Sequence, residues 1–234
     1  NAHCAHRRWA GVRPRLRHMT WQWALPIVVA AAVAAATPAI LRALPSPSDE
    51  PTSRPYDRLA TRGFAVVAFA LMAACGGLVL ATAPQHAFAW AGLGTAGVLG
   101  AMTDARTEYL PAALMRAGWV LTAVGSLITA AVASDWYVVL RAVIGALATT
   151  ALFWLFHRLG GFGFGDVRLA PIIGATAAGL SWPALAGALL LGGLLGVAWG
   201  LVWRALGRGK AFPYGPALVA GPYLALIWLA VLPP

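Results

Sequence analysis

Apolar residues along this chain form long runs of about 20 residues, separated by short breaks of charged residues, Pro and Gly. A helix of about 20 residues crosses the hydrocarbon core of a bilayer. The pattern therefore predicts an all-α fold, a polytopic membrane bundle of about eight transmembrane helices. The expected spans are residues 23–44, 63–83, 86–103, 114–133, 136–156, 162–182, 183–206 and 216–232.

The composition agrees with a membrane protein. Of the 234 residues, 60% are hydrophobic and only 10% are charged, which excludes an ordinary soluble domain. The net charge of +10 could indicate a nucleic-acid partner, but the arginines lie at the ends of the predicted helices and not on one soluble face. We therefore expect a lipid bilayer around the protein and no nucleic acid bound to it.

The basic residues predict the topology. After residue 18, every basic residue except Arg141 lies at an alternate break, after the first, third, fifth and seventh spans: Arg42, Arg54, Arg58, Arg62, Arg106, Arg116, Arg158, Arg168, Arg204, Arg208 and Lys210. The positive-inside rule places these breaks in the cytosol and both termini outside. Arg141, six residues after Asp135, is expected to extend its side chain to the membrane interface.

Three segments are predicted along the chain. Residues 1–18 hold five basic residues that would face the wrong side of the membrane, so we interpret them as a doubtful N-terminal extension. Residues 19–62 hold the first helix and a short cytosolic linker, 44–62, which is rich in Pro, Ser and charge and predicted to lack a core. Residues 63–234 form the main membrane domain.

Small and metal-binding residues limit the remaining interpretations. Gly192, Gly196 and Gly200 share one helix face, which serves packing within the chain or a homodimer contact. Cys4 and Cys75 are too few for a four-cysteine zinc site or a disulfide framework, and the histidines show no metal-ligand spacing. We expect neither a metal nor another cofactor.

The candidate chemistry begins with the segment 160–174, GGFGFGDVRLAPIIG. Asp166 follows the alternating glycines Gly163 and Gly165 and opens an otherwise apolar helix. Ionisable residues in membrane helices are rare and usually functional, so Asp166 is a candidate catalytic residue. The alternative is an aspartate that only caps the helix.

A second aspartate, Asp104, stands at the cytosolic end of the predicted third span. The 61 residues between Asp104 and Asp166 allow one hairpin of two spans, which would return both carboxyls to the same membrane face. Alone, Asp104 would also fit an ordinary helix-end charge. Two carboxyls without a metal suit aspartic hydrolysis, in which one is ionised and the other protonated. The helix dipoles predict Asp166 as the anion and Asp104 as the acid.

Three motifs resemble those of the prepilin peptidase family, membrane aspartic proteases of the GxGD type. They are DARTEYLP at 104–111, GFGDVRLAPIIG at 163–174 and PYGPALVAG at 213–221, in family order. The resemblance covers about residues 63–232 and implies that Asp104 and Asp166 are the catalytic pair. It also implies supporting roles for Gly163, Gly165, Arg168, Pro111, Pro213, Gly215 and Pro216. Arg168 stands where the family usually has Lys, and Leu110 and Ala112 depart from the usual first motif.

The resemblance implies a hydrolase of the bacterial inner membrane. Such an aspartic endopeptidase, working in type IV pilus assembly and secretion, removes the basic leader of prepilin or pseudopilin precursors at the cytosolic face. Bifunctional members hold a cysteine-containing cytosolic domain, associated with N-methylation, between the first two spans. Here that position is the linker 44–62, so we expect a short form in which 63–234 is the aspartic peptidase domain.

Two alternatives remain open. A presenilin-like or signal-peptide-peptidase-like protease is suggested by Pro216-Ala217-Leu218, although Thr103, not Tyr, precedes Asp104. A non-enzymatic membrane transporter or assembly factor would use its aspartates to relay protons or to cap helices. A proton relay would need acidic residues at mid-membrane depth on several spans, and the predicted spans contain none.

Overall fold

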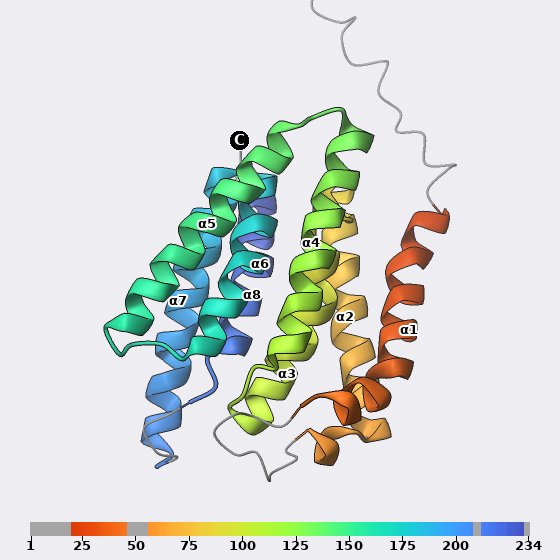
Figure 1. Ribbon diagram of the computed structural model, residues 1–234. Helices are drawn as coiled ribbons and strands as arrows, with labels where there is room; N and C mark the ends of the chain where they lie inside the picture. Colours follow the sequence, from red (N-terminus) through yellow and green to blue (C-terminus); the bar gives the residue numbers. More distant parts are fainter. Residues whose placement is uncertain (1–19, 46–55, 208–211, 232–234) are drawn as a thin grey trace, which may run out of the picture.

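The computed structural model describes residues 20–45, 56–207 and 212–231, and in them the chain folds into eight α-helices without strands (Figure 1). The helices are α1 (Thr20–Ala43), α2 (Arg62–Thr82), α3 (Val98–Thr107), α4 (Ala112–Ala133), α5 (Tyr137–Arg158), α6 (Phe164–Leu180), α7 (Trp182–Ala205) and α8 (Gly215–Val231). Short helical turns are η1 (Asp57–Leu59), η2 (Pro84–His86) and η3 (Leu93–Gly97). The predicted all-helical bundle is confirmed.

Not every predicted span is long enough to cross a bilayer by itself. Among the described residues, five helices are sufficiently long and apolar: Ala24–Ala43, Arg62–Thr82, Ala112–Ala133, Tyr137–Arg158 and Trp182–Ala205. Helices α6 and α8 have 17 residues each, slightly less than a typical span. The predicted third span is divided, because η2 at Pro84 and the π-helical turn η3 precede a short α3.

Successive helices run in opposite directions, so their ends meet at two faces of the bundle. At one face, drawn at the bottom of Figure 1, the odd-numbered helices end and the even-numbered ones begin. The arginines at these helix ends therefore gather on one side, as the positive-inside pattern requires. That this side is cytosolic, with both termini outside, stays a prediction. The proposed extension 1–18 and linker residues 46–55 lie outside the described residues.

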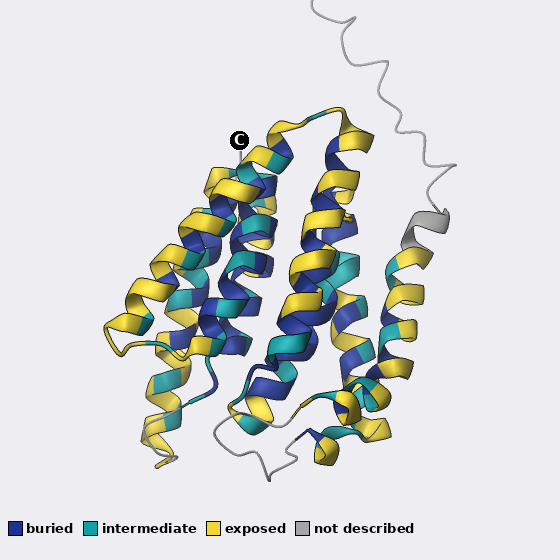
Figure 2. Cartoon of the chain, viewed as in Figure 1, coloured by how far each residue is buried: buried dark blue, intermediate teal, exposed yellow. Residues whose placement is uncertain are grey.

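Helices α6 and α8 form the centre of the bundle (Figure 2). Eleven of the 17 residues of α6 are buried, and its most extensive contacts are with α5. Gly145 of α5 faces the backbone of Gly174 on α6, and the Thr149 hydroxyl donates a hydrogen bond to the Gly145 carbonyl oxygen. Small residues thus let the two helices approach closely, which fixes the position of α6.

The glycine stripe of α7 packs within the same chain. A Cβ atom at Gly192 would lie 3.4 Å from Cα of Gly221 on α8, and one at Gly200 would lie 3.0 Å from the Phe212 ring. Gly196 lies against the Tyr214 ring. The stripe therefore serves the α7–α8 contact, and a homodimer stays a prediction.

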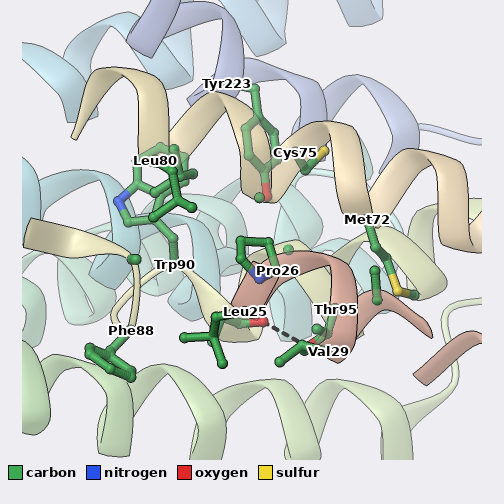
Figure 3. A pocket seen from close by; sticks show the side chains of 16 residues that line it. Leu25, Pro26, Val29, Met72, Cys75, Leu80, Phe88, Trp90, Thr95 and Tyr223 are labelled. Atoms are coloured by element: carbon green, nitrogen blue, oxygen red, sulfur yellow. Dashed lines mark hydrogen bonds between the residues drawn. The ribbon is translucent and has the colours of Figure 1, made fainter. Parts of the chain in front are cut away.

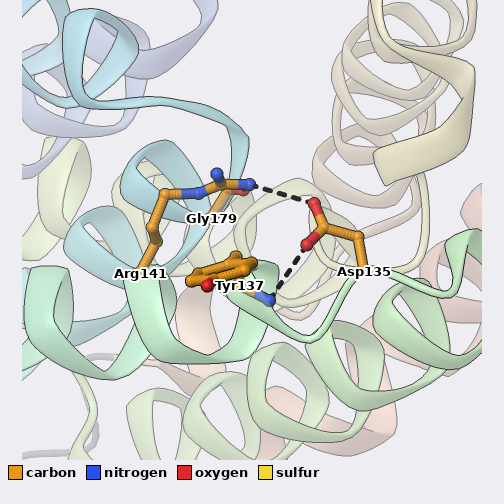
Figure 4. Close-up of polar contacts among 4 residues, drawn as sticks. All are labelled: Asp135, Tyr137, Arg141 and Gly179. Carbon is orange, nitrogen blue, oxygen red and sulfur yellow. Dashed lines mark hydrogen bonds and ion pairs between the residues drawn. The ribbon is translucent and has the colours of Figure 1, made fainter.

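Arg141 makes contacts within the bundle (Figure 4). Its Nη2 atom lies 3.6 Å from Asp135 Oδ2 and donates to the Gly179 carbonyl oxygen at 3.2 Å. Asp135 Oδ1 accepts a hydrogen bond from the Tyr137 amide at 3.0 Å. Arg141 thereby ties the α4–α5 turn to the last turn of α6; that its side chain reaches the membrane interface stays a prediction.

Candidate active site

Asp104 lies in the last turn of α3 and is only 5% exposed. The helix ends at Glu108, whose left-handed backbone (φ 59°) lets its amide donate to the Asp104 carbonyl oxygen at 2.8 Å. The side chain has a different partner: Asp104 Oδ2 accepts a hydrogen bond from the Gly215 amide at 2.8 Å. Gly215 is the first residue of α8, so Asp104 caps the N-terminus of a helix 111 residues further along the chain.

Asp166 lies in the first turn of α6 and is 7% exposed. Its Oδ2 atom accepts a hydrogen bond from the Gly163 amide at 3.1 Å, while its own amide donates to the Gly163 carbonyl oxygen at 3.2 Å. These reciprocal bonds resemble a capping box and hold the carboxyl at the start of α6. The cap explains the fixed position of Asp166, but it does not explain why the group is buried.

The two carboxyls influence each other electrostatically. Burial is the main cause that raises the pKa of Asp104 to about 6 and that of Asp166 to about 7, and the charge of Asp104 raises the pKa of Asp166 further. Both groups lie at helix ends, outside the five helices that qualify as spans. The structure thus brings the two predicted aspartates to one face of the bundle, within electrostatic range of each other.

The surroundings of Asp104 remove the basis of the dipole prediction. That prediction considered only the helix to which each aspartate belongs, and it placed the anion at Asp166. The structure shows that Asp104 also faces the N-terminus of α8, where the Gly215 amide lowers its pKa against the effect of burial. The Gly163 amide likewise lowers the pKa of Asp166, so each carboxyl accepts one backbone amide that favours its ionised form.

The first two motifs are packed against each other through Leu110 and Gly165. A Cβ atom added to Gly165 would lie 2.9 Å from Cβ of Leu110, and one added to Gly100 would lie 3.3 Å from Leu110 Cδ2. The next residue, Pro111, is the buried N-cap of α4, in an extended conformation with ψ 121°. Gly165 is thus needed for close approach, because its backbone conformation is not left-handed.

We predict that Gly165→Ala lowers both stability and activity more than Gly163→Ala does. An added methyl group at Gly165 overlaps Leu110, and such overpacking typically costs about 1–3 kcal/mol. At Gly163, the nearest atom to an added Cβ is Asp166 Oδ2 at an ordinary 3.6 Å. Thermal unfolding of the two purified variants measures the difference. Equal losses would contradict the Leu110–Gly165 contact.

The other predicted supporting residues have different surroundings. Pro213 is buried and Pro216 half-buried on either side of Gly215. Arg168 does not join the carboxyls: its guanidinium lies over the Phe164 ring, 4.6 Å from the centroid. Its backbone carbonyl accepts a hydrogen bond from Trp119 Nε1 at 2.7 Å, which links α6 to α4.

Two tyrosines near the carboxyls were not identified from the sequence. Tyr56 is 4% exposed, and burial, with smaller effects from Tyr109 and Asp104, raises its pKa to about 12. Among the described residues of the linker, Tyr56 alone is buried, whereas Asp57 and Arg58 beside it are exposed. The only sequence signal was a lone aromatic residue in a polar segment.

Tyr214 connects the second and third motifs. Its ring makes an edge-to-face contact with Phe162, with the centroids 4.8 Å apart, and the next residue, Gly215, binds Asp104. Burial, followed by the charge of Asp166, raises the pKa of Tyr214. Tyr214 and Gly215 thus bring the start of α8 close to both aspartates. Among the described residues, no cluster of three or more His, Cys, Asp or Glu side chains could hold a metal ion.

The fold and the site define a helical, multi-pass membrane protein with two buried aspartates at one face of the bundle. Part of the chain is similar to a known family. The type IV leader peptidase family matches residues 91–201, a range that includes both aspartates. This match favours the prepilin peptidase resemblance over the presenilin-like one.

Curated relatives agree with this match. The prepilin leader peptidase/N-methyltransferase of Aeromonas salmonicida (strain A449) is 35% identical over 96 residues, which cover 38% of this chain and 32% of the relative. The protein of the same name from Burkholderia pseudomallei (strain K96243) is 33% identical over 158 residues, 63% of this chain and 48% of the relative. The chain therefore spans less than half the length of these relatives. No solved structure matches the chain significantly.

Proposed function

We propose that this protein is an aspartic endopeptidase that removes the basic leader of type IV prepilin or pseudopilin precursors at the cytosolic face of the bacterial inner membrane. The observation that carries the proposal is the pair of buried aspartates, which come from separate motifs to one face. The electrostatic effect of Asp104 on Asp166 is the behaviour expected of a dyad that shares one proton.

The proposed reaction gives each carboxyl one role. Ionised Asp104, stabilised by the Gly215 amide, takes a proton from a water molecule whose oxygen attacks the scissile carbonyl carbon. Protonated Asp166 donates its proton to the carbonyl oxygen, which forms a neutral tetrahedral diol. When the C–N bond breaks, Asp104 passes its proton to the leaving nitrogen and a diol hydroxyl returns a proton to Asp166.

The location of the site suggests the form of the substrate. Both aspartates lie at the face where the arginine-bearing helix ends gather. Under the predicted topology this face is cytosolic. It suits a single-pass precursor whose basic leader remains in the cytosol and whose cleaved bond precedes its apolar helix.

Co-expression with a prepilin from the same genome tests the proposal. We expect the precursor to shorten by the length of its leader on a gel, with a new N-terminus that sequencing places just before the apolar segment. A precursor that remains full length beside a folded, membrane-inserted protein would contradict the proposed activity.

We predict a bell-shaped pH dependence for leader cleavage. The rate should rise as Asp104 ionises, near its pKa of about 6, and fall as Asp166 loses its proton, near its pKa of about 7. Initial rates of the purified enzyme between pH 4 and pH 9, an assay range of about five units, would show an optimum near neutrality. A rate that stays constant into the alkaline range would contradict the acid role of Asp166.

We also predict that the protein cleaves without methylating the new N-terminus. The linker between the first two helices has 19 residues, 44–62, and contains no cysteine. A methyl-donor cofactor needs a pocket of several hundred Å³ within a folded scaffold, for which this linker is too short. Mass spectrometry of pilin processed by this protein alone, in a host without another methylase, measures the outcome. A methylated N-terminal residue would refute the prediction.

A further inference from the structure

A second feature of the bundle is a cavity of about 180 Å³ that includes neither aspartate among its lining residues. It lies between α1, α2, the segment around η3, and α8 (Figure 3). Leu25 and Pro26 of α1, Met72 of α2 and Trp90 before η3 contribute to its walls. Nearly all of the lining surface is apolar, and no lining residue carries a charge.

The cavity has a buried floor and an exposed rim. Met72 and Trp90 are 3% and 2% exposed, whereas Leu25 and Phe88 at the rim are 42% and 41% exposed. Leu25 and Phe88 belong to the outer, apolar surface that faces lipid in the predicted membrane arrangement. The cavity therefore opens sideways toward the hydrocarbon region, from which an apolar ligand could enter.

Two lining residues, Trp90 and Tyr223, carry buried polar atoms that lack a good hydrogen-bond partner, and the Tyr223 hydroxyl is the only hydroxyl of the two. Tyr223 of α8 is 7% exposed, and its hydroxyl has no hydrogen-bond partner other than the Cys75 thiol. Figure 3 shows this hydroxyl pointing toward Pro26 on the facing wall. Cys75 lies beside it, but a thiol is only a weak hydrogen-bonding group.

Water is a poor candidate for the missing partner. Apolar cavities of about 150 Å³ remain dry in proteins and take up small apolar molecules. A water molecule also needs two to four polar partners, and the lining offers too few. A buried tyrosine hydroxyl normally finds an acceptor, and leaving it unpaired is unfavourable.

We propose that this cavity binds a small membrane-soluble ligand with an apolar body and one carbonyl-type acceptor oxygen. The apolar body fills the space between α1 and α2, and the oxygen accepts a hydrogen bond from the Tyr223 hydroxyl. A plain hydrocarbon would leave Tyr223 unpaired, and a charged headgroup would find no counter-charge in the lining. The site is independent of the proposed peptidase reaction.

Protection of Cys75 from a thiol reagent tests this proposal. Cys75 lines the cavity, so an occupant should block its reaction with N-ethylmaleimide. The full chain carrying Cys4→Ser, purified in detergent, is treated in the presence of 5-nonanone or of nonane, two probes of equal chain length. We expect both probes to protect Cys75. The measured quantity is the ratio of the ketone concentration to the nonane concentration that gives half protection. This ratio should be about two- to tenfold lower in the parent protein than in a Tyr223→Phe variant.

The variant comparison cancels any difference in how the two probes partition into micelles. Tyr137→Phe, which removes a hydroxyl from an exposed tyrosine, is the matched control and should behave like the parent protein. The increase in thermal midpoint caused by each probe provides a second measurement that does not depend on thiol reactivity. If neither probe protects Cys75 or stabilises the protein, the cavity is not a binding site. If Tyr223→Phe leaves the ketone preference unchanged, the assigned hydrogen bond is wrong.

Discussion

Asp104→Asn and Asp166→Asn should each reduce leader cleavage by at least about 10²- to 10⁴-fold, while the protein remains folded in the membrane. Asparagine keeps the size of the side chain and an oxygen that accepts the Gly215 or Gly163 amide, so both helix caps survive. It neither takes a proton from water, the role proposed for Asp104, nor donates an acidic proton, the role proposed for Asp166. Each substitution alone therefore removes one half of the reaction.

Asp135→Asn provides the control for these variants. It makes the same chemical change at the opposite end of the bundle, where Asp135 contacts Arg141 and the Tyr137 amide. Co-expression of each variant with the prepilin, followed by a gel for leader removal, should show cleavage by Asp135→Asn alone. Full cleavage by either of the other two variants would exclude the dyad.

Thermal unfolding separates this loss of chemistry from a loss of structure. The folded-state pKa of Asp166, about 7, lies above the value of about 3.9 expected in the unfolded chain. The folded protein thus binds more protons than the unfolded chain between these values, so its stability falls as the pH rises through this window. Asp166→Asn removes that loss. At a pH of about 8, which lies above this window, the thermal midpoint of Asp166→Asn should equal or exceed that of the parent protein.

The sequence predicted the helices well where local signals end them. Helix α7 begins at Trp182 because the Ser181 hydroxyl accepts a hydrogen bond from the Ala184 amide at 3.1 Å, a cap that the Ser-Trp-Pro sequence suggests. The prediction of one regular helix for the third span was wrong, because hydrophobicity alone does not report the π-helical turn η3. Inside that turn the Thr95 hydroxyl donates to the Ala91 carbonyl oxygen at 2.6 Å, and the helix continues with a changed register.

For the site too, the sequence revealed the local features and missed the contacts between distant segments. Asp104 and Asp166 were identifiable because each is a lone acid beside an apolar helix. The Gly215 amide that binds Asp104, and the burial of Tyr56 near it, depend on segments far apart in sequence. No periodicity reports such contacts. This is why the sequence located both carboxyls but not the second helix N-terminus that acts on Asp104.

Gly215→Ala should reduce leader cleavage by roughly 10²-fold, because a displacement of about 1 Å at a catalytic group has an effect of this size. A Cβ atom at Gly215 would lie 2.8 Å from Asp104 Oδ2 and 3.2 Å from its Cγ, so the carboxyl must move away. Movement of Asp104 lengthens its bond to the Gly215 amide, which removes the interaction that favours the ionised form. The pH optimum should then shift upward, since Asp104 needs a higher pH to ionise.

The backbone shows that this loss would arise at the site and not in the helix. Gly215 does not have a positive φ, and alanine favours the helical conformation more than glycine does, so α8 itself should tolerate the change. Gly193→Ala on α7 is the matched control, because an added Cβ there meets no atom within 4 Å. Initial rates across pH for the two variants, with their thermal midpoints, test the idea. If Gly215→Ala retained the parent rate and pH optimum, the Gly215 amide would have no role in setting the charge of Asp104.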